Sequence, residues 1–269
     1  MDLSLDVAMQ VAIEAAATAG EILRNMLDIA EVREKAPKDL VTDADVASQK
    51  AIETRLLTAF PEHLFLGEES GDNPLAVYPS DQDRGQWVVD PLDGTANYVH
   101  RLPNFAVSIA LMRGNTSYVG VVYDPMSDEL YAAKKGGGAT VNGKPLRCSS
   151  CVDLNYAMVA ASFPPQISRE SIELKQFIEI LLRSQSVRRL GSAALNLCYV
   201  AQGRLDAYWA GCLKPWDIAG GGLIAQEAGA IITTQNGRPF DPWLGELVAT
   251  STPSLNQQVR DCLAMFDSP

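Results

Sequence analysis

Long apolar runs are absent from this sequence of 269 residues, and their absence limits the classes of protein to which it can belong. No segment approaches the roughly 18 consecutive apolar residues that span a bilayer, so we expect no membrane-spanning helix. The N-terminus, MDLSLD, carries neither a basic region nor a cleavage pattern, so we expect no signal peptide and a cytoplasmic protein. Hydrophobic residues still make up 47% of the chain, which is enough for a substantial core.

Positive charge is also scarce. The chain has 22 lysines and arginines against 33 acidic residues, which gives a net charge of −11 at pH 7. Contacts to a nucleic-acid backbone need a basic surface, and the pairs Lys134–Lys135 and Arg188–Arg189 are isolated. The sequence therefore disfavours a nucleic-acid partner.

Histidine and cysteine, the usual nucleophilic and zinc-binding residues, are few. The histidines are His63 and His100, and no G-x-S-x-G nucleophile motif occurs. Five cysteines is an odd number in a chain without an export signal, so a disulfide framework is not expected. Cys148 and Cys151 have C-x-x-C spacing but no second pair to complete a zinc site, so we interpret them as structural thiols.

The acidic residues, in contrast, are patterned. At 90–95 the sequence reads DPLDGT directly after the apolar run QWVV, so Asp90 and Asp93 lie where a strand gives way to a turn. Two carboxylates this close are costly to keep charged unless a cation lies between them, and hard divalent cations prefer oxygen ligands. Gly94 permits a sharp turn, and Thr95 can begin a helix whose amides face an anion. A metal beside an anion cradle indicates phosphate ester chemistry.

A D-x-x-D pair in a turn is more often a solvated turn or a helix cap. Two further acidic elements favour the metal interpretation. Glu68 and Glu69, in GEES at 67–70, follow the apolar run LFL, and Asp217, in PWD at 215–217, opens a segment of small residues. Open α/β sheets bind their ligands at such strand ends.

Hydrophobic periodicity predicts an N-terminal helix at residues 4–29, with Val7, Val11 and Ala15 at helical spacing, and a second helix at 44–60, with Val46 among the inward-facing side chains. Short apolar segments then predict strands at 64–66, 87–89, 106–112, 118–123, 130–134 and 139–146. Asn142-Gly143 marks a tight hairpin turn. We expect these strands to form an antiparallel sheet.

After residue 150 strands and helices alternate, which predicts an α/β arrangement. Strands are expected at 157–161, 186–190, 205–209 and 230–233, and helices at 169–182, 193–201 and 217–227. The change of pattern predicts an N-terminal α+β lobe at 1–150 with the main metal-binding motifs. A C-terminal α/β lobe at 151–269 would complete the active site of one compact unit.

Five motifs together resemble one known family. DLVTDAD at 39–45, GEES at 67–70, DPLDGTANYVH at 90–100, GSAALN at 191–196 and PWDIAGG at 215–221 occur in the order and spacing of the inositol monophosphatase family. Its members are magnesium-dependent, lithium-sensitive phosphatases. The resemblance implies a layered αβαβα sandwich, a homodimer, and hydrolysis of inositol 1-phosphate or a related sugar or polyol phosphate.

The resemblance also implies two to three Mg²⁺ ions in each active site. Glu68, Asp90 and the Leu92 carbonyl would hold one ion. Asp90, Asp93 and Asp217 would hold the second, with Asp90 bridging, and a third, weaker ion would lie near Glu68. Few protein ligands per ion are expected, because Mg²⁺ keeps several of its waters.

Thr95 and Asp45 resemble the family's water-activating pair, in which a hydroxyl orients the attacking water and a carboxylate takes up the proton. The same two residues are equally consistent with plain helix caps, since Asp45 falls in a first helical turn and Thr95 at a helix start. Glu69 is expected to support the catalytic centre without binding metal directly, because adjacent residues of an extended segment point to opposite faces. Lys35 falls near the family's mobile-loop lysine, although its spacing to DLVT is one residue shorter, and is otherwise an ordinary solvated lysine.

The substrate contacts follow from the resemblance as well. The amides of Gly94 and Thr95 would bind the phosphate oxygens, and the alcohol half would lie against Gly191, Ser192 and Ala193. Ala210 stands where inositol-specific members carry a glutamate that binds the inositol hydroxyls, and a pocket without that polar anchor loses discrimination.

Several alternatives stay open at this point. Histidinol phosphate, fructose 1,6-bisphosphate and nucleotide phosphates are candidate substrates within the same family. From another class, the chain could be a catalytically silent module that binds metal or a protein. The presence of Thr95 and Asp45 beside a complete ligand set argues against silence, because a binding module needs no water activator.

Overall fold

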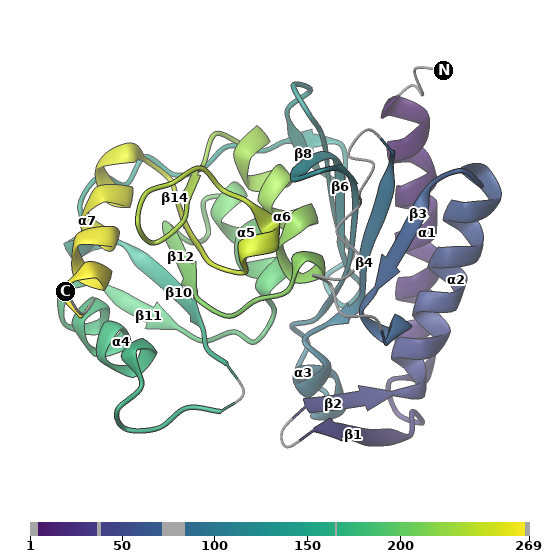
Figure 1. The fold of residues 1–269 in the computed structure, drawn as a ribbon, viewed down its shortest axis with the longest axis horizontal. Helices are drawn as coiled ribbons and strands as arrows, with labels where there is room; N and C mark the ends of the chain where they lie inside the picture. Colours follow the sequence, from purple (N-terminus) through teal and green to yellow (C-terminus); the bar gives the residue numbers. More distant parts are fainter. Residues whose placement is uncertain (1–4, 37–38, 72–83, 165, 267–269) are drawn as a thin grey trace.

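The computed structural model describes residues 5–36, 39–71, 84–164 and 166–266. Helices and sheets alternate in five layers across the molecule (Figure 1). The layers are helices α1 (Leu5–Met26) and α2 (Asp43–Ala59), a seven-stranded sheet, helices α5 (Ala193–Ala201) and α6 (Pro215–Glu227), a five-stranded sheet, and helices α4 (Ile172–Arg183) and α7 (Pro253–Ala264). The expected αβαβα sandwich is therefore confirmed. Among the described residues no helix is both long and apolar enough to cross a membrane.

The seven-stranded sheet has the order β3-β4-β5-β6-β7-β8-β9. Its strands are β3 (Leu64–Gly67), β4 (Gln86–Asp93), β5 (Ala106–Arg113), β6 (Thr116–Asp124), β7 (Glu129–Lys134), β8 (Ala139–Val141) and β9 (Lys144–Pro145). All neighbours are antiparallel except β3, which runs parallel to β4. Asn142 and Gly143 have φ of 47° and 74°, the left-handed values that a tight hairpin turn requires.

The five-stranded sheet is mixed and has the order β11-β10-β12-β14-β13. Its strands are β10 (Met158–Ser162), β11 (Ser186–Arg188), β12 (Ala207–Ala210), β13 (Ile231–Thr233) and β14 (Leu247–Thr250). Strand β14 and helix α7 lie outside the predicted elements. So does a two-stranded sheet of β1 (Val32–Ala36) and β2 (Asp39–Thr42). The short helix α3 (Thr95–Val99), which begins at Thr95 as expected, lies beside this sheet (Figure 1).

Both faces of the two large sheets are covered, so their central strands are buried along nearly their whole length and alternation only divides the two faces. On β4, Trp87 and Val89 pack into the core under α1 and α2, whereas Val88 packs on the opposite side with Trp216 of α6. The α1–α2 layer and the α5–α6 layer therefore pack on opposite faces of this sheet.

Helix α1 packs through small residues and not through its valine at position 7. Ala12, Ala16 and Ala19 are fully buried, whereas Val7 is 54% exposed and Val46 of α2 is 46% exposed. The inward orientation predicted for Val46 is therefore wrong, and Val7 lies outside the buried side of α1. Alanine contributes little side-chain volume, so the helix can lie close to its neighbours.

Helix α6 is held in the middle layer by glycines. A Cβ on Gly120 of β6 would lie 2.5 Å from the Gly220 carbonyl oxygen, and a Cβ on Gly221 would lie 2.9 Å from Leu197 of α5. Three consecutive glycines weaken a helix, but here the close approach leaves no room for side chains. This approach sets the position of Asp217, which lies in the first turn of α6.

The two sheets divide the chain near the predicted lobe boundary at 150. The seven-stranded sheet ends at Pro145, and the five-stranded sheet begins at Met158. Helix α6 nevertheless packs on the first sheet, where the Ser108 hydroxyl donates to the Trp216 carbonyl at 3.2 Å. Two lobes with separate roles stay a prediction, because the halves share this middle layer.

Candidate active site

A bulge in β4 brings both acids of the DPLD motif to one face. Asp90 pairs with Ser108 and Asp93 pairs with Ala106, so three steps along β4 match two along β5. Residues three apart in a regular strand point to opposite faces, but the extra residue of a bulge restores a common face. Ser108 contacts α6 and Ala106 lies in the core beside α5, so both carboxylates face the α5–α6 layer.

The turn after β4 places the start of α3 beside these acids. Gly94 caps the helix with φ of 97°, a left-handed conformation that favours glycine. Thr95 begins α3, and its hydroxyl lies 3.1 Å from the Leu92 carbonyl oxygen and 3.3 Å from Asp45 Oδ1. The structure thus brings the predicted pair of Thr95 and Asp45 together.

Asp45 is a helix cap and a partner of Thr95 at the same time. Its Oδ2 accepts hydrogen bonds from the Thr42 amide at 2.8 Å and from the Thr42 hydroxyl at 2.6 Å, and the side chain is buried. This capping box at the start of α2 immobilises the carboxylate, which leaves Oδ1 facing Thr95.

Two residues of α2 that the motifs did not indicate extend this face of the helix. The Ser48 hydroxyl donates to the Pro91 carbonyl at 2.8 Å, and Gln49 Oε1 accepts from the Glu69 amide at 2.8 Å. They attach both acidic segments to one helix. The available signal was their spacing of three and four residues from Asp45, which places all three polar side chains on one helical face.

Asp93 is attached to the first turn of α5. Its Oδ2 accepts hydrogen bonds from the Ser192 hydroxyl at 2.5 Å and from the Ala194 amide at 2.7 Å. The same hydroxyl caps α5 by accepting from the Leu195 amide at 3.2 Å. The Ser192 side chain is fully buried, and its hydroxyl is engaged by Asp93 and by the Leu195 amide.

Asp217 and Glu68 complete the acidic set. Asp217 Oδ2 accepts from the Lys214 amide at 2.7 Å, and Asp217 lines the same cleft as Asp90. Glu68 and Glu69 lie in a single 3₁₀ turn, η1 (Glu68–Ser70), and not in the extended segment that was expected. Successive side chains of such a turn also point in different directions, and Glu68 lines the cleft whereas Glu69 does not.

These side chains surround a cleft of about 270 Å³. It is lined by Leu40, Glu68, Asp90, Leu92, Asp93, Gly94, Thr95, Ala96, Gly191 and Asp217. An adjoining hollow of about 190 Å³ shares Asp93, Gly191 and Asp217 and adds Ser162, Phe163, Arg189, Ala193 and Leu213. Of the predicted site residues, Lys35 alone has a side chain that falls outside the described part of the chain, and only its backbone in β1 is placed.

The carboxylates of the cleft repel one another. Burial, followed by the charges of Glu68, Asp93 and Asp217, raises the pKa of Asp90 well above its usual value. Burial and the neighbouring acids likewise raise the pKa of Asp217. Burial raises the pKa of Asp93 to about 6, and the hydrogen bonds from α5 oppose that rise because they favour the charged form.

The donor set fits a hard divalent cation. Four carboxylates and the Leu92 carbonyl offer oxygen ligands only, which suits Mg²⁺. In the parts of the chain that the structure describes, no three acidic, imidazole or thiol groups are already drawn together at metal-binding distances. Cations among the acids would remove the repulsion that raises their pKa values.

Comparisons with known proteins identify the family of this chain. A model of the inositol monophosphatase family matches residues 4–264. Inositol monophosphatase 1 of Solanum lycopersicum is 38% identical over 98% of this chain and 97% of its own length. Nus factor SuhB of Vibrio cholerae is 39% identical over 90% of this chain and 91% of its own. The crystal structure of the extragenic suppressor protein SuhB from Bartonella henselae has a TM-score of 0.88 at 33% identity, and the match covers 97% of this chain and 100% of that one.

The match therefore extends well beyond the short motifs and confirms the resemblance that they indicated. Members of this family are generally Mg²⁺-dependent, in agreement with the oxygen-only donor set of the cleft. The chain belongs to the inositol monophosphatase family and is a phosphatase enzyme.

Proposed function

We propose that the protein hydrolyses the phosphate monoester of a small polyol or sugar, such as inositol 1-phosphate, and that Mg²⁺ in the acidic cleft is required. The strongest support for this proposal is the convergence of acidic side chains beside Thr95. Four acids from three separate segments converge on a cleft that also contains Thr95, whose hydroxyl faces Asp45.

The acids divide naturally between two ions. Glu68, Asp90 and the Leu92 carbonyl would hold one, and Asp90, Asp93 and Asp217 the second, with a third, weaker ion near Glu68. Bound Mg²⁺ supplies positive charge for the phosphoryl oxygens and lowers the pKa of water. Glu69 supports this arrangement through η1, whose backbone is attached to α2 by Gln49.

Thr95 and Asp45 orient the attacking water. The Thr95 hydroxyl donates toward Asp45 Oδ1, so its lone pairs accept a hydrogen bond from the water. As the water attacks phosphorus, the ester P–O bond breaks and the alcohol leaves, taking a proton from solvent water. The proton of the attacking water passes to Thr95 Oγ1 while the hydroxyl proton passes to Asp45. Thr42 holds the other oxygen of Asp45, which keeps the carboxylate in position for this transfer. The amides of Gly94 and Thr95 bind the phosphate oxygens.

The alcohol half of the substrate occupies the adjoining hollow, against Gly191 and Ala193. Ala210 is almost fully buried in β12 and offers no polar anchor, so we propose that several phosphate esters are accepted with only a modest preference for inositol phosphate. The Arg189 guanidinium, 5.3 Å from the centre of the Phe163 ring, lines this hollow. A cation there suits a second phosphate, which favours fructose 1,6-bisphosphate over histidinol phosphate as the alternative substrate.

Three finer expectations belong to the same proposal. The protein forms a homodimer, Lys35 approaches the bound phosphate, and the compartment is the cytoplasm. Sedimentation velocity with and without Mg²⁺ tests the first of these. A Lys35→Gln variant with an unchanged KM for every phosphate ester would contradict the expectation that Lys35 approaches the bound phosphate.

Phosphate release from a panel of monoesters, with Mg²⁺ and with chelator, tests the proposed activity. We expect hydrolysis only with Mg²⁺, and we expect Asp93→Asn to abolish it because the neutral amide no longer attracts the ion. Asp153→Asn is the matched control, since Asp153 caps a turn with its carboxylate and does not line the cleft. Full activity in chelator-treated protein would contradict the metal mechanism.

A second role is a candidate because several bacterial relatives carry the name Nus factor SuhB. A net charge of −11 disfavours direct contact with nucleic acid, so such a role would act through protein partners. If a Thr95→Ala variant corrects a cellular defect caused by loss of the protein but does not hydrolyse phosphate esters, the two roles are separate.

A further inference from the structure

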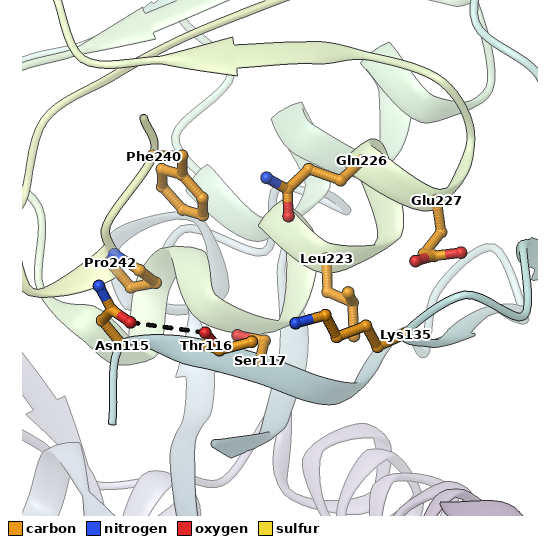
Figure 2. Close-up of a pocket in the computed structure, with 9 residues that line it drawn as sticks. All are labelled: Asn115, Thr116, Ser117, Lys135, Leu223, Gln226, Glu227, Phe240 and Pro242. Carbon is orange, nitrogen blue, oxygen red and sulfur yellow. Dashed lines mark hydrogen bonds between the residues drawn. The ribbon is translucent and has the colours of Figure 1, made fainter. Parts of the chain in front are cut away.

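A second cavity lies at the other end of α6 from the catalytic cleft. We call it the α6 pocket: a hollow of about 370 Å³ between the β5–β6 turn, the last turn of α6 and the segment 240–242. Figure 2 shows Lys135 and Gln226 extending their polar ends into it, with Phe240 and Pro242 on the facing side. It is larger than the catalytic cleft and within the size range of sites that hold small ligands.

The cavity contains a positive charge that the protein leaves available. In the described part of the chain Lys135 forms no ion pair, and its Nζ lies 5.0 Å from the centre of the Tyr118 ring. Glu227, the acid at the edge of the pocket, is engaged elsewhere, because its two oxygens accept hydrogen bonds from the amides of Gly136 and Gly138 at 2.7 and 2.8 Å. An anion beside Lys135 would therefore gain a charged donor without displacing a carboxylate.

The rest of the lining combines hydrogen-bonding groups with an apolar wall. Asn115 and Gln226 supply amides, and Phe240, Leu223 and Pro242 supply a surface against which a ring can pack. Polar side chains make up most of the lining and the apolar residues form one wall, so the pocket suits a polar ligand that has one planar apolar face.

The walls of the pocket are anchored, so the hollow is a fixed feature of the fold. A Cβ on Gly222 would lie 2.6 Å from Phe240 Cε1, which places the ring directly on α6. The Ser117 hydroxyl donates to the Ala219 carbonyl at 3.1 Å, and the Trp243 indole donates to the Gly114 carbonyl at 3.1 Å. These bonds hold the β5–β6 turn and the 240–242 segment against the helix.

We propose that the α6 pocket binds a small phosphorylated compound with a planar ring, of the nucleoside monophosphate class, separately from the catalytic cleft. Its phosphate lies at Lys135, its ring packs on Phe240, and its hydroxyls bond to Gln226 and Asn115. The two sites occupy opposite ends of one helix, since Gln226 lies nine residues beyond Asp217, or about 14 Å along α6.

Calorimetric titration of the full chain with AMP, in chelator, tests the proposal. Without Mg²⁺ the acids of the catalytic cleft repel a phosphate, so binding there is suppressed. We expect Lys135→Gln to weaken AMP binding at least tenfold, and Asp93→Asn to leave it unchanged. Lys144→Gln is the matched control, because Lys144 is also exposed and the same charge is removed outside the pocket.

The separate halves of the ligand define the orientation. Adenosine should bind without sensitivity to Lys135→Gln, and ribose 5-phosphate should remain sensitive to it. Phe240→Leu, which keeps an apolar wall, should weaken adenosine more than ribose 5-phosphate. AMP binding that survives Lys135→Gln, or that becomes stronger with Asp93→Asn, would overturn the proposal, the second result because removing a repelling acid favours a phosphate in the catalytic cleft.

Discussion

Replacing Ser192 with alanine tests how the middle layer orients a catalytic acid. The hydroxyl makes two hydrogen bonds, one to Asp93 Oδ2 at 2.5 Å and one from the Leu195 amide at 3.2 Å. Loss of a helix cap costs about 1 kcal/mol, and loss of a hydrogen bond to a charged group about 1.5–3 kcal/mol. Since the two losses are not fully additive, we expect Ser192→Ala to lower the free energy of unfolding by about 2–3 kcal/mol.

The functional effect should exceed what lower stability alone produces. Asp93 would keep the Ala194 amide but lose its shorter partner, so its carboxylate could rotate away from the cleft. Removing the groups that support a metal ligand typically weakens metal binding or activity by about 10–100-fold. We expect the Mg²⁺ concentration for half-maximal phosphate release to rise by about this factor, measured at a temperature where the variant is fully folded.

Thr252→Ala provides a closely matched control. Thr252 caps α7 by accepting from the Leu255 amide at 3.3 Å and donates to the Cys151 carbonyl at 2.7 Å, so it also makes a cap and one donated hydrogen bond, here to a neutral acceptor. This control should lose stability without any change in Mg²⁺ dependence. Equal Mg²⁺ dependence in Ser192→Ala and Thr252→Ala would refute the reasoning, because Ser192 would then be only a helix cap.

Three further predictions follow from the same geometry. Thr95→Ala should lower kcat about 10²–10⁴-fold with little change in Mg²⁺ dependence, because its hydroxyl is assigned to the water; a loss below about threefold would make Thr95 only part of a helix start. In chelator, burial raises the pKa of Asp93 to about 6, above the unfolded value of about 3.9, so its stabilisation is complete below about pH 4 and is lost as the pH rises through 6. The melting temperature of metal-free protein should fall over that window and Mg²⁺ should remove the fall; a rise with pH would contradict the assignment. Ala210→Glu should raise kcat/KM for inositol 1-phosphate relative to an aryl phosphate about fivefold, because residue 210 pairs in register with Ser162 of the adjoining hollow; unchanged selectivity would show that it does not face the alcohol.

Local sequence was sufficient for most regular elements of the fold. The helix at 193–201 was predicted with its observed bounds, and the hairpin at Asn142-Gly143 has the backbone angles that its residues favour. The predictions were wrong where packing, and not hydrophobic periodicity, decides which side chains are buried. Val46 was expected to face inward but is 46% exposed. Val7 shares the helical spacing of Val11 and Ala15, yet those two are buried and Val7 is 54% exposed.

The chemistry of the site was also visible in the sequence, because it depends on residue type. Carboxylates at strand ends and a hydroxyl at a helix start indicate a hard cation and a phosphate in any arrangement that brings them together. Asp90, Asp93 and Asp217 were therefore identified as candidate ligands before any distance was known. The comparisons show the family, and the roles of these individual residues stay a proposal.

Only the tertiary structure decided how these residues are oriented. Asp90 and Asp93 would point to opposite faces of a regular strand, and they share a face because the bulge against β5 inserts one extra residue. Ser192 was expected to touch the substrate, but its hydroxyl bonds to Asp93, a residue 99 positions earlier in the chain. A linear pattern records which groups are present and how they repeat. The direction of each side chain depends on the partner that the stacked layers place opposite it, and that partner comes from a distant part of the chain.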